Sequence, residues 1–141
     1  MANRKIVIVD DEPLLVEILS EHFLAAGWEV AGATNGHEAL KKIVEFQPTV
    51  LLSDINMPGL DGLELLETLY KQESQLPVIL LSGYRDLQKM QRAWASCCYD
   101  FLDKPVDVDH VLSIAQTAHE NGPEYIKFAR KRFSLSHKSA S

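Results

Sequence analysis

Five short apolar runs alternate with segments of helical periodicity along the chain. The runs are rich in branched side chains and are bounded by turn-forming residues, a pattern typical of strands buried on both faces. Strands that alternate with helices predict a parallel sheet covered by helices on both sides. A chain of 141 residues suits one such α/β domain. The expected strands lie at residues 6–9, 29–33, 50–53, 78–81 and 101–102.

Proline, glycine and capping residues mark the expected helix ends. Pro13 stands in the first turn of the first helix, and Gly27 follows its end. Asn35 and Glu38 have the spacing of a helix-capping pair, which predicts that the second helix begins there. The expected helices cover residues 13–26, 35–46, 63–72 and 87–96, and a fifth begins after Pro105 with Asp107 as its cap.

Polar residues follow the ends of these apolar runs. Asp10 and Asp11 end the first run, and Asp54 ends the third. Ser82 ends the fourth run, and Lys104 follows the fifth. Because the carboxyl ends of parallel strands lie on one edge of a sheet, we expect these side chains to converge. Three carboxylates in one place repel each other unless a cation lies among them, which suggests a magnesium-dependent phosphoryl site.

Four stretches of the chain resemble the response-regulator receiver domain, the phospho-acceptor module of two-component signalling. They are IVIVDDEP at 6–13, LLSDINMPGLDG at 51–62, VILLSG at 78–83 and DFLDKP at 100–105. Their order and spacing make the match specific, and it covers about residues 4–121. The resemblance implies a flavodoxin-like, doubly wound sheet of five parallel strands in the order 2-1-3-4-5 with five helices.

The resemblance also implies roles for the polar residues. Asp54 would accept a phosphoryl group from a sensor histidine kinase or a histidine phosphotransfer protein. Asp11 and Asp54 would bind Mg²⁺ directly, Asp10 would act largely through water, and Asn56 would contribute its backbone carbonyl. Lys104 would pair with Asp54 at rest and with a phosphoryl oxygen afterwards, and a cis peptide bond before the following proline is similar to the family.

Four further positions are expected to contact the phosphoryl group, to flank the path of water or to take part in the switch. Ser82 would donate a hydrogen bond to the phosphoryl group. Phe101 matches the family's switch aromatic, although an ordinary core phenylalanine explains it equally well. Asn56 and Tyr84 flank the path of the hydrolytic water, and we expect the bulky Tyr84 to slow loss of the phosphoryl group. The change in charge on phosphorylation would alter the surface of the fourth helix, fifth strand and fifth helix. That surface could bind a downstream protein, an output domain or a second copy of the chain.

Cys97 and Cys98 stand where the family usually has Gly-Ala. Glycine suits that position because a helix often ends in a left-handed residue. A cysteine in that geometry carries strain of roughly 1 kcal/mol, and a different loop path is the alternative. Adjacent cysteines suit neither a disulfide framework nor a zinc site, so we expect two buried thiols.

Three aromatic positions carry weaker expectations. His22 falls on the apolar side of the first helix, formed by Leu15, Ile18, Leu19 and Phe23, and is expected in the core. Trp28 is expected to pack at the entry to the second strand. Trp94 is either a core residue or an exposed anchor.

The charge is unevenly distributed. The net charge is −6, but residues 1–121 carry 9 basic and 19 acidic residues (net −10), whereas residues 122–141 carry 5 and 1 (net +4). The acidic receiver portion, residues 1–121, is a poor candidate for a nucleic-acid binder. Asn121-Gly122-Pro123 is expected to end that domain. Residues 122–141 are then expected to form a basic tail or linker, with a short helix and disorder from Ser134 to Ser141.

Composition sets further limits. No run approaches the roughly 18 apolar residues of a membrane helix, and the start lacks the pattern of a signal peptide. We therefore expect a cytoplasmic protein that does not associate with membranes.

Other functions fit the residues less well. A magnesium phosphatase resembling the haloacid-dehalogenase family needs a second acid two residues after the nucleophile, where this chain has Asn56. A flavin protein needs hydroxyls and backbone amides where residues 10–13 are acidic. A degenerate receiver that serves only as a binding platform would not need the complete site. The leading hypothesis is a signalling switch that is not an enzyme, either a single-domain regulator or part of a longer one.

Overall fold

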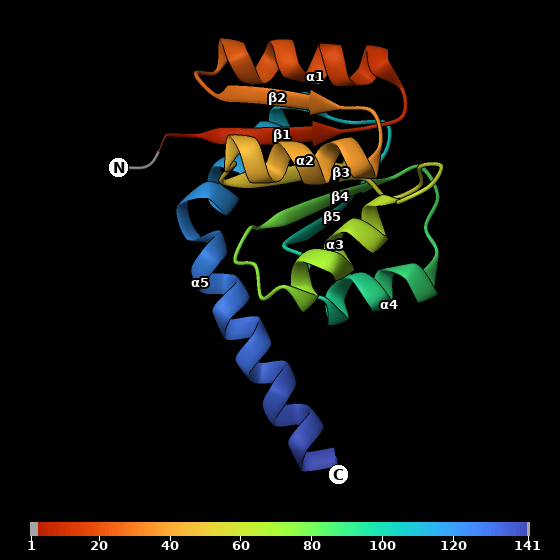
Figure 1. Cartoon of the computed structure of the whole chain (residues 1–141), viewed down its shortest axis with the longest axis vertical. Coiled ribbons are helices and arrows are strands. Elements are labelled where there is room, and N and C mark those ends of the chain that lie inside the picture. Colours follow the sequence, from red (N-terminus) through yellow and green to blue (C-terminus); the bar gives the residue numbers. More distant parts are fainter. Residues whose placement is uncertain (1–2, 141) are drawn as a thin grey trace.

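The five apolar runs form one parallel sheet in the computed structural model, which describes residues 3–140 and the side chains of residues 3–132 (Figure 1). The strand order is β2-β1-β3-β4-β5, which confirms the predicted sheet and the order implied by the family resemblance. The strands are β1 (Lys5–Val9), β2 (Glu29–Ala33), β3 (Val50–Asp54), β4 (Val78–Ser82) and β5 (Asp100–Asp103).

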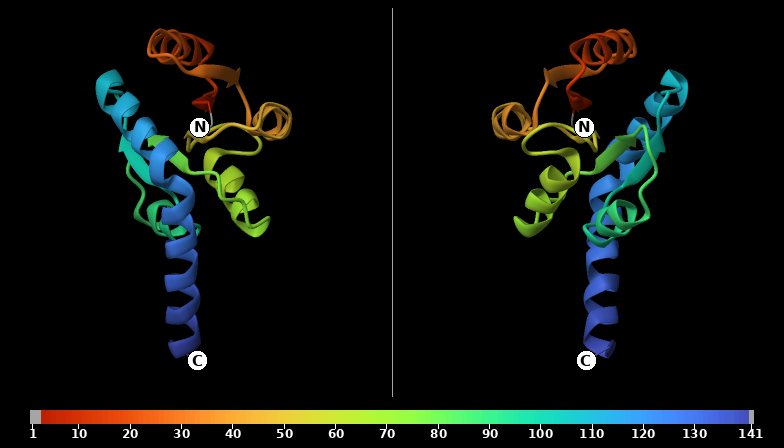
Figure 2. Two further views of the ribbon diagram at one scale, coloured as in Figure 1. Left: turned by 90° about the vertical axis from the view of Figure 1, so that its left-hand side faces the viewer. Right: turned by 90° about the vertical axis from the view of Figure 1, so that its right-hand side faces the viewer.

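Helices cover both faces of the sheet (Figures 1 and 2). Apolar side chains form a core on each face. In β1, Ile6 and Ile8 belong to one core, whereas Val7 and Val9 belong to the other. This alternation follows from the two-residue period of a strand, and it explains why the central strands are apolar throughout. One core packs against α1 (Pro13–Ala25) and α5 (Val108–Ala140), the other against α2 (Gly36–Phe46), α3 (Gly62–Lys71) and α4 (Leu87–Ala95).

The predicted helix caps are present. The backbone N–H of Glu38 donates to Asn35 Oδ1 at 2.8 Å, and that of His110 donates to Asp107 Oδ1 at 3.3 Å. Asp61 adds a reciprocal capping box at the start of α3. Such caps satisfy backbone donors that have no partner within the helix, so they fix where each helix begins. None of the described helices has the length and apolar character needed to cross a membrane.

Cys97 adopts the left-handed backbone that the sequence analysis considered for it. Its φ is 61°, and the N–H of Cys98 donates to the carbonyl of Ala93 at 3.0 Å, which closes the end of α4. The same turn ends α1 at Gly27, with φ of 91°. The cysteine therefore adopts the left-handed conformation usual for glycine at a helix end, at a cost of about 1 kcal/mol. Both thiols are buried, as expected.

The prediction for His22 is wrong. Helix α1 buries Val16, Leu19 and Phe23, and both His22 and Ile18 are exposed. The inner face of the helix is therefore centred on the side that carries Val16, and His22 points away from it. The mistake was one of angular position on the helix, since neighbouring residues lie about 100° apart.

The tryptophans lie in different settings. Trp28 is buried, and its ring meets that of Phe23 edge-to-face at 5.4 Å between centroids, which confirms its packing role. Trp94 is 45% exposed on α4, as expected for the second of its two alternatives.

Helix α5 continues through the segment that was expected to end it. Gly122 and Pro123 lie inside a helix that reaches Ala140, so the break expected at residues 121–123 is absent. A Cβ atom on Gly122 would lie 2.6 Å from Cγ of Pro77. Glycine is therefore required here for close packing between the helix and the loop before β4, and its turn-like signal misled the sequence analysis.

Residues beyond Pro123 pack against the rest of the molecule. Ile126 is buried, and the Arg130 guanidinium lies 4.1 Å from the ring centroid of Tyr70 and donates to the Tyr70 carbonyl. The first part of the expected tail is thus attached to α3. The helix also covers residues 134–140, where disorder was expected, and Ser141 lies outside the described residues. Whether residues 122–141 act as a separate tail or linker stays a prediction.

Candidate functional site

The register of the sheet brings the predicted polar residues to one edge. Val9 of β1 is opposite Ser53 of β3, so the residues that follow them, Asp10 and Asp54, lie side by side. Asp54 is in turn opposite Leu81, the residue before Ser82 on β4. The convergence therefore follows from parallel pairing of adjacent strands whose apolar runs end at the same level.

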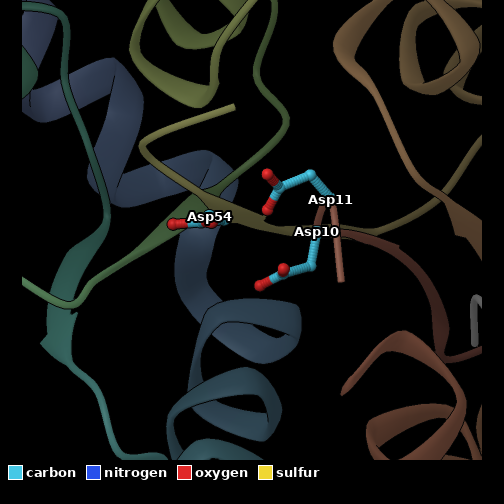
Figure 3. Close-up of side chains that lie close together, drawn as sticks. All are labelled: Asp10, Asp11 and Asp54. Atoms are coloured by element: carbon cyan, nitrogen blue, oxygen red, sulfur yellow. The ribbon is translucent and has the colours of Figure 1, made fainter. Parts of the chain in front are cut away.

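Three carboxylates form the centre of the site. Asp10, Asp11 and Asp54 each offer an oxygen, and the three oxygens lie within 4.8 Å of one another (Figure 3). Asp10 and Asp54 are 1% and 6% exposed, whereas Asp11 is exposed. One oxygen of Asp10 accepts from the N–H of Glu12 at 2.9 Å and the other accepts from Lys104 at 2.8 Å, which leaves the oxygens of Asp11 more available to a cation. Clustered carboxylate oxygens are the donor set that Mg²⁺ prefers, so the residues fit such an ion.

Lys104 supplies the positive charge of the cluster. Its Nζ lies 2.8 Å from Asp10 Oδ2 and 3.3 Å from Asp54 Oδ2. Burial alone would lower the pKa of Lys104, but its hydrogen bond to Asp10 and the charge of Asp54 outweigh burial and raise that pKa. The ammonium therefore stays charged at neutral pH. The Lys104-Pro105 peptide bond is cis, as the family resemblance implied.

Burial makes the charged form of Asp54 less favourable. Removal from water raises the pKa of this carboxyl group, the charge of Lys104 partly offsets that rise, and the charge of Asp10 adds to it. Ionised Asp54 therefore has an unfavourable electrostatic free energy in the folded protein. A further cation at the site would reduce that unfavourable energy.

The Ser82 hydroxyl is bonded within its own loop. It donates to the Tyr84 carbonyl at 2.5 Å and accepts from the Tyr84 N–H at 3.2 Å. The same loop is joined to the end of β5 by an ion pair, with Arg85 Nη2 2.7 Å from Asp103 Oδ2. Ser82 therefore lies at the predicted edge, but its hydroxyl is engaged with a carbonyl of the loop that follows it.

Comparison with known proteins identifies the family. The family model described as "Response regulator receiver domain" matches residues 6–116. The chain belongs to the response-regulator receiver domain family.

Individual relatives agree with this family. The receiver domain is 36% identical over 119 residues to the C4-dicarboxylate transport transcriptional regulatory protein DctD of Pseudomonas aeruginosa, a match that covers 84% of this chain and 26% of that protein. It is 32% identical over 111 residues to the Sporulation initiation phosphotransferase F of Bacillus subtilis, which covers 79% of this chain and 90% of that protein. The chain thus spans about a quarter of the length of the regulatory relative and most of the length of the phosphotransferase.

A solved structure gives the same result for the fold. A CheY-like response regulator receiver domain protein from Methanospirillum hungatei JF-1 superposes with a TM-score of 0.82 at 25% identity, covering 87% of this chain and 98% of that one. The flavodoxin-like architecture predicted from the resemblance is therefore confirmed.

Phe101 of the receiver domain lies in the core. It is 8% exposed and belongs to the apolar cluster on the α2-α3-α4 side, together with Ala93 and Met90 of α4. This position agrees with an ordinary core residue and with a switch residue in its inward orientation. Its role in switching stays a prediction.

The receiver site includes one contact that the sequence analysis missed. Asn56 is exposed, and its N–H donates to Asp54 Oδ1 at 3.3 Å, while its Oδ1 accepts from Lys89 Nζ at 2.6 Å. Lys89 lies in the first turn of α4, 33 positions from Asn56 in the sequence. No local motif marks it, because the contact depends on how α4 packs beside the loop after β3.

Proposed function

We propose that this receiver domain accepts a phosphoryl group on Asp54 and that the modification alters its protein-binding surface. The phosphoryl donor would be a histidine kinase or a histidine phosphotransfer protein. The observation that supports this most directly is the position of Lys104, whose ammonium bridges two buried carboxylates beside the exposed Asp11. A cluster of this kind has a nucleophile, a fixed cation and oxygen ligands within a few ångströms.

The residues of the site would divide the transfer among them. An oxygen of Asp54 would attack the phosphorus of the donor phosphohistidine, the nitrogen–phosphorus bond would break, and its electron pair would stay on the imidazole. Lys104 would exchange its contact with Asp54 for one with a phosphoryl oxygen. The Ser82 hydroxyl would leave the Tyr84 carbonyl and donate to another phosphoryl oxygen.

Mg²⁺ fits as the cofactor of this reaction. Asp11 and Asp54 would hold it through carboxylate oxygens, the backbone carbonyl of Asn56 would add a ligand, and Asp10 would act largely through water. The ion would neutralise charge on the oxygens of the group being transferred. Asp10, Asp11 and Asp54 would otherwise repel that group.

Phosphorylation by a small donor tests the proposal. With acetyl phosphate and Mg²⁺, the bond between phosphorus and the acetyl oxygen breaks, acetate leaves and Asp54 gains the phosphoryl group. We expect intact mass to show one added phosphoryl group in the wild type, its loss without Mg²⁺, and no addition in Asp54→Ala. Addition to the variant, or none to the wild type with Mg²⁺ present, would contradict the assignment.

Tyr84 is expected to govern the lifetime of the phosphorylated form. Its side chain is 78% exposed, two positions after Ser82 on the loop beside the site. A bulky ring there would obstruct the water that attacks phosphorus opposite the aspartyl oxygen. Tyr84→Ala should shorten the phosphoryl half-life by roughly threefold or more, equivalent to at least ~0.7 kcal/mol of barrier. Half-lives from intact mass after donor removal measure this, with Val44→Ala on the exposed side of α2 as a control; equal half-lives for Tyr84→Ala and the wild type would overturn it.

The proposed output surface is the face formed by α4, β5 and α5. Leu87 and Trp94 expose apolar side chains on α4, and Tyr125 and Phe128 do so on α5. This face would bind a downstream protein or an output domain, and it could support a homodimer. No contact with nucleic acid or membrane is proposed for this chain.

We also propose that the domain is a phospho-acceptor rather than an enzyme acting on other substrates. Asn56 stands where an aspartyl-phosphate phosphatase needs its second acid, so the phosphatase alternative is not favoured. A platform without phosphorylation is disfavoured because each expected site residue is present. The cytoplasmic location stays a prediction.

A further inference from the structure

Lys89 connects helix α4 to the loop that carries Asn56. Its Nζ donates to Asn56 Oδ1 at 2.6 Å. The carboxylate of Asp86 accepts from the backbone N–H groups of Gln88 and Lys89, at 3.0 and 3.2 Å, so the first turn of α4 has a defined start. The base of the Lys89 side chain is therefore fixed, and only the flexible stem separates it from its contact.

Asn56 extends this connection to the phospho-acceptor. Its backbone N–H donates to Asp54 Oδ1 at 3.3 Å. A contact on the Asn56 side chain thus acts on a residue that already touches Asp54. The two segments that flank Asp54, the loop after β3 and the start of α4, are joined by this Lys89–Asn56 hydrogen bond.

The ammonium groups of Lys89 and Lys104 have different neighbours. Lys104 contacts two carboxylates, and the cluster of three aspartates and one lysine carries a net charge of −2 (three negative charges and one positive). Lys89 contacts a neutral amide, and within residues 3–132 it forms no ion pair with a carboxylate. Its ammonium is therefore not paired with a carboxylate, and through Asn56 it lies beside the negatively charged site.

An anionic phosphoryl donor needs such a charge. A small acyl phosphate carries about two negative charges and must approach the acidic cluster before transfer. A cation at the entrance lowers the electrostatic cost of that approach and raises the local concentration of the donor. Because Lys89 does not contact Asp54 itself, its effect falls on the encounter with the donor, and Asn56 holds the ammonium in place.

We propose that Lys89 is a positioning residue for phosphoryl transfer to Asp54, drawing anionic small donors to the site through a location held by Asn56. This inference rests on the proposed function of Asp54. It assigns the recruitment of acyl phosphates to a residue of α4, separate from Lys104, which acts on the reacting group itself.

The test measures the initial rate of phosphorylation against acetyl phosphate concentration at saturating Mg²⁺. In Lys89→Met, the donor concentration that gives half the maximal rate should rise about threefold to tenfold, while the maximal rate stays within about twofold. Lys89→Arg should have nearly the wild-type half-saturating concentration. Added salt should reduce the difference in half-saturating concentration between the wild type and Lys89→Met. Lys71→Met removes the same charge at the far end of α3 and should match the wild type.

Placement by Asn56 has its own test. In an Asn56→Ala background, Lys89→Met should change the half-saturating concentration less than it does in the wild type, because the amide that holds the ammonium is already absent. Equal half-saturating concentrations in Lys89→Met and Lys71→Met would overturn the proposal. So would a loss confined to the maximal rate, or an undiminished effect in the Asn56→Ala background. A wild type that gains no phosphoryl group would instead refute the proposed function of Asp54.

Discussion

Lys104→Met should accept a phosphoryl group from acetyl phosphate about a hundredfold more slowly than the wild type. The ammonium lies within hydrogen-bonding distance of Asp10 and 3.3 Å from Asp54, where charge develops during transfer. Loss of one such preorganised group typically costs about 100-fold in rate, or ~2.7 kcal/mol. Initial rates from intact mass at saturating Mg²⁺ measure the effect, and a loss below about threefold would contradict a role for Lys104 in the reaction.

The same variant should lose stability in a manner that depends on pH. The raised pKa of Lys104 means that its stabilising contribution is complete below its ordinary value of 10.5 and is lost only as pH rises through the higher folded value. At pH 7 the wild type therefore has the full contribution. Removing the ammonium leaves Asp10 and Asp54 buried and negatively charged, at a cost of about 2 kcal/mol in the free energy of unfolding.

The stability loss of Lys104→Met should be smaller at acidic pH. Burial already raises the pKa of Asp54, and without Lys104 that pKa rises further, so one carboxyl group takes up a proton as pH falls and the repulsion ends. An acid with a raised folded pKa destabilises the protein most when it is ionised. Urea unfolding of Lys104→Met and of Lys71→Met at pH 7 and at about pH 4.5 measures this; an equal deficit at both pH values would show that the buried charges are not its cause.

Gly62→Ala should disturb both folding and phosphorylation. A Cβ atom at this position would lie 2.1 Å from the carbonyl oxygen of Asp54 and 2.9 Å from Ser53 Oγ. The start of α3 or the end of β3 must move to make room. Overpacking of this kind costs about 2 kcal/mol in the free energy of unfolding, and the shift displaces Asp54, the proposed phospho-acceptor. We expect a lower urea midpoint and a phosphorylation rate reduced about tenfold.

Gly122→Ala separates these two effects. Its Cβ would lie 2.6 Å from Pro77 Cγ, so it also crowds a packed contact, but that contact lies where α5 meets the loop before β4, at the edge of the sheet opposite Asp54. Phosphorylation rates are compared at a urea concentration and temperature at which both variants are fully folded. Gly122→Ala should then keep the wild-type rate. Equal losses in the two variants would mean that the effect of Gly62→Ala comes from instability alone.

The sequence predicted those features that are encoded locally. Runs such as residues 78–81 are apolar throughout because the central strands are buried on both faces, and the polar residue after each run marks the sheet edge. Asn35 and Asp107 identified helix starts because a cap is a contact between near neighbours. The positions of Asp10 and Asp54 at one edge followed from parallel topology.

The features that were missed depend on tertiary packing. The pair Gly122-Pro123 carries a local turn signal, yet the contacts of Ile126 and Arg130 with the rest of the molecule favour a continuous helix. The orientation of the Ser82 hydroxyl depends on a side-chain rotation that no spacing encodes. Lys89 reaches Asn56 only because two distant elements pack side by side.

The continuous α5 helix extends as an arm beyond the body of the domain (Figure 1). Cys97 at the end of α4 borders the same small cavity as Ile126 and Arg130, so a shift of α4 would press on the arm where it leaves the body. Ala140 lies ten residues after Arg130, which is about 15 Å along the helix at 1.5 Å per residue. A tilt of about 10° at that point would displace its far end by roughly 3 Å. A small shift of α4 would thus become a displacement of the end of α5 that is large enough to alter a protein contact.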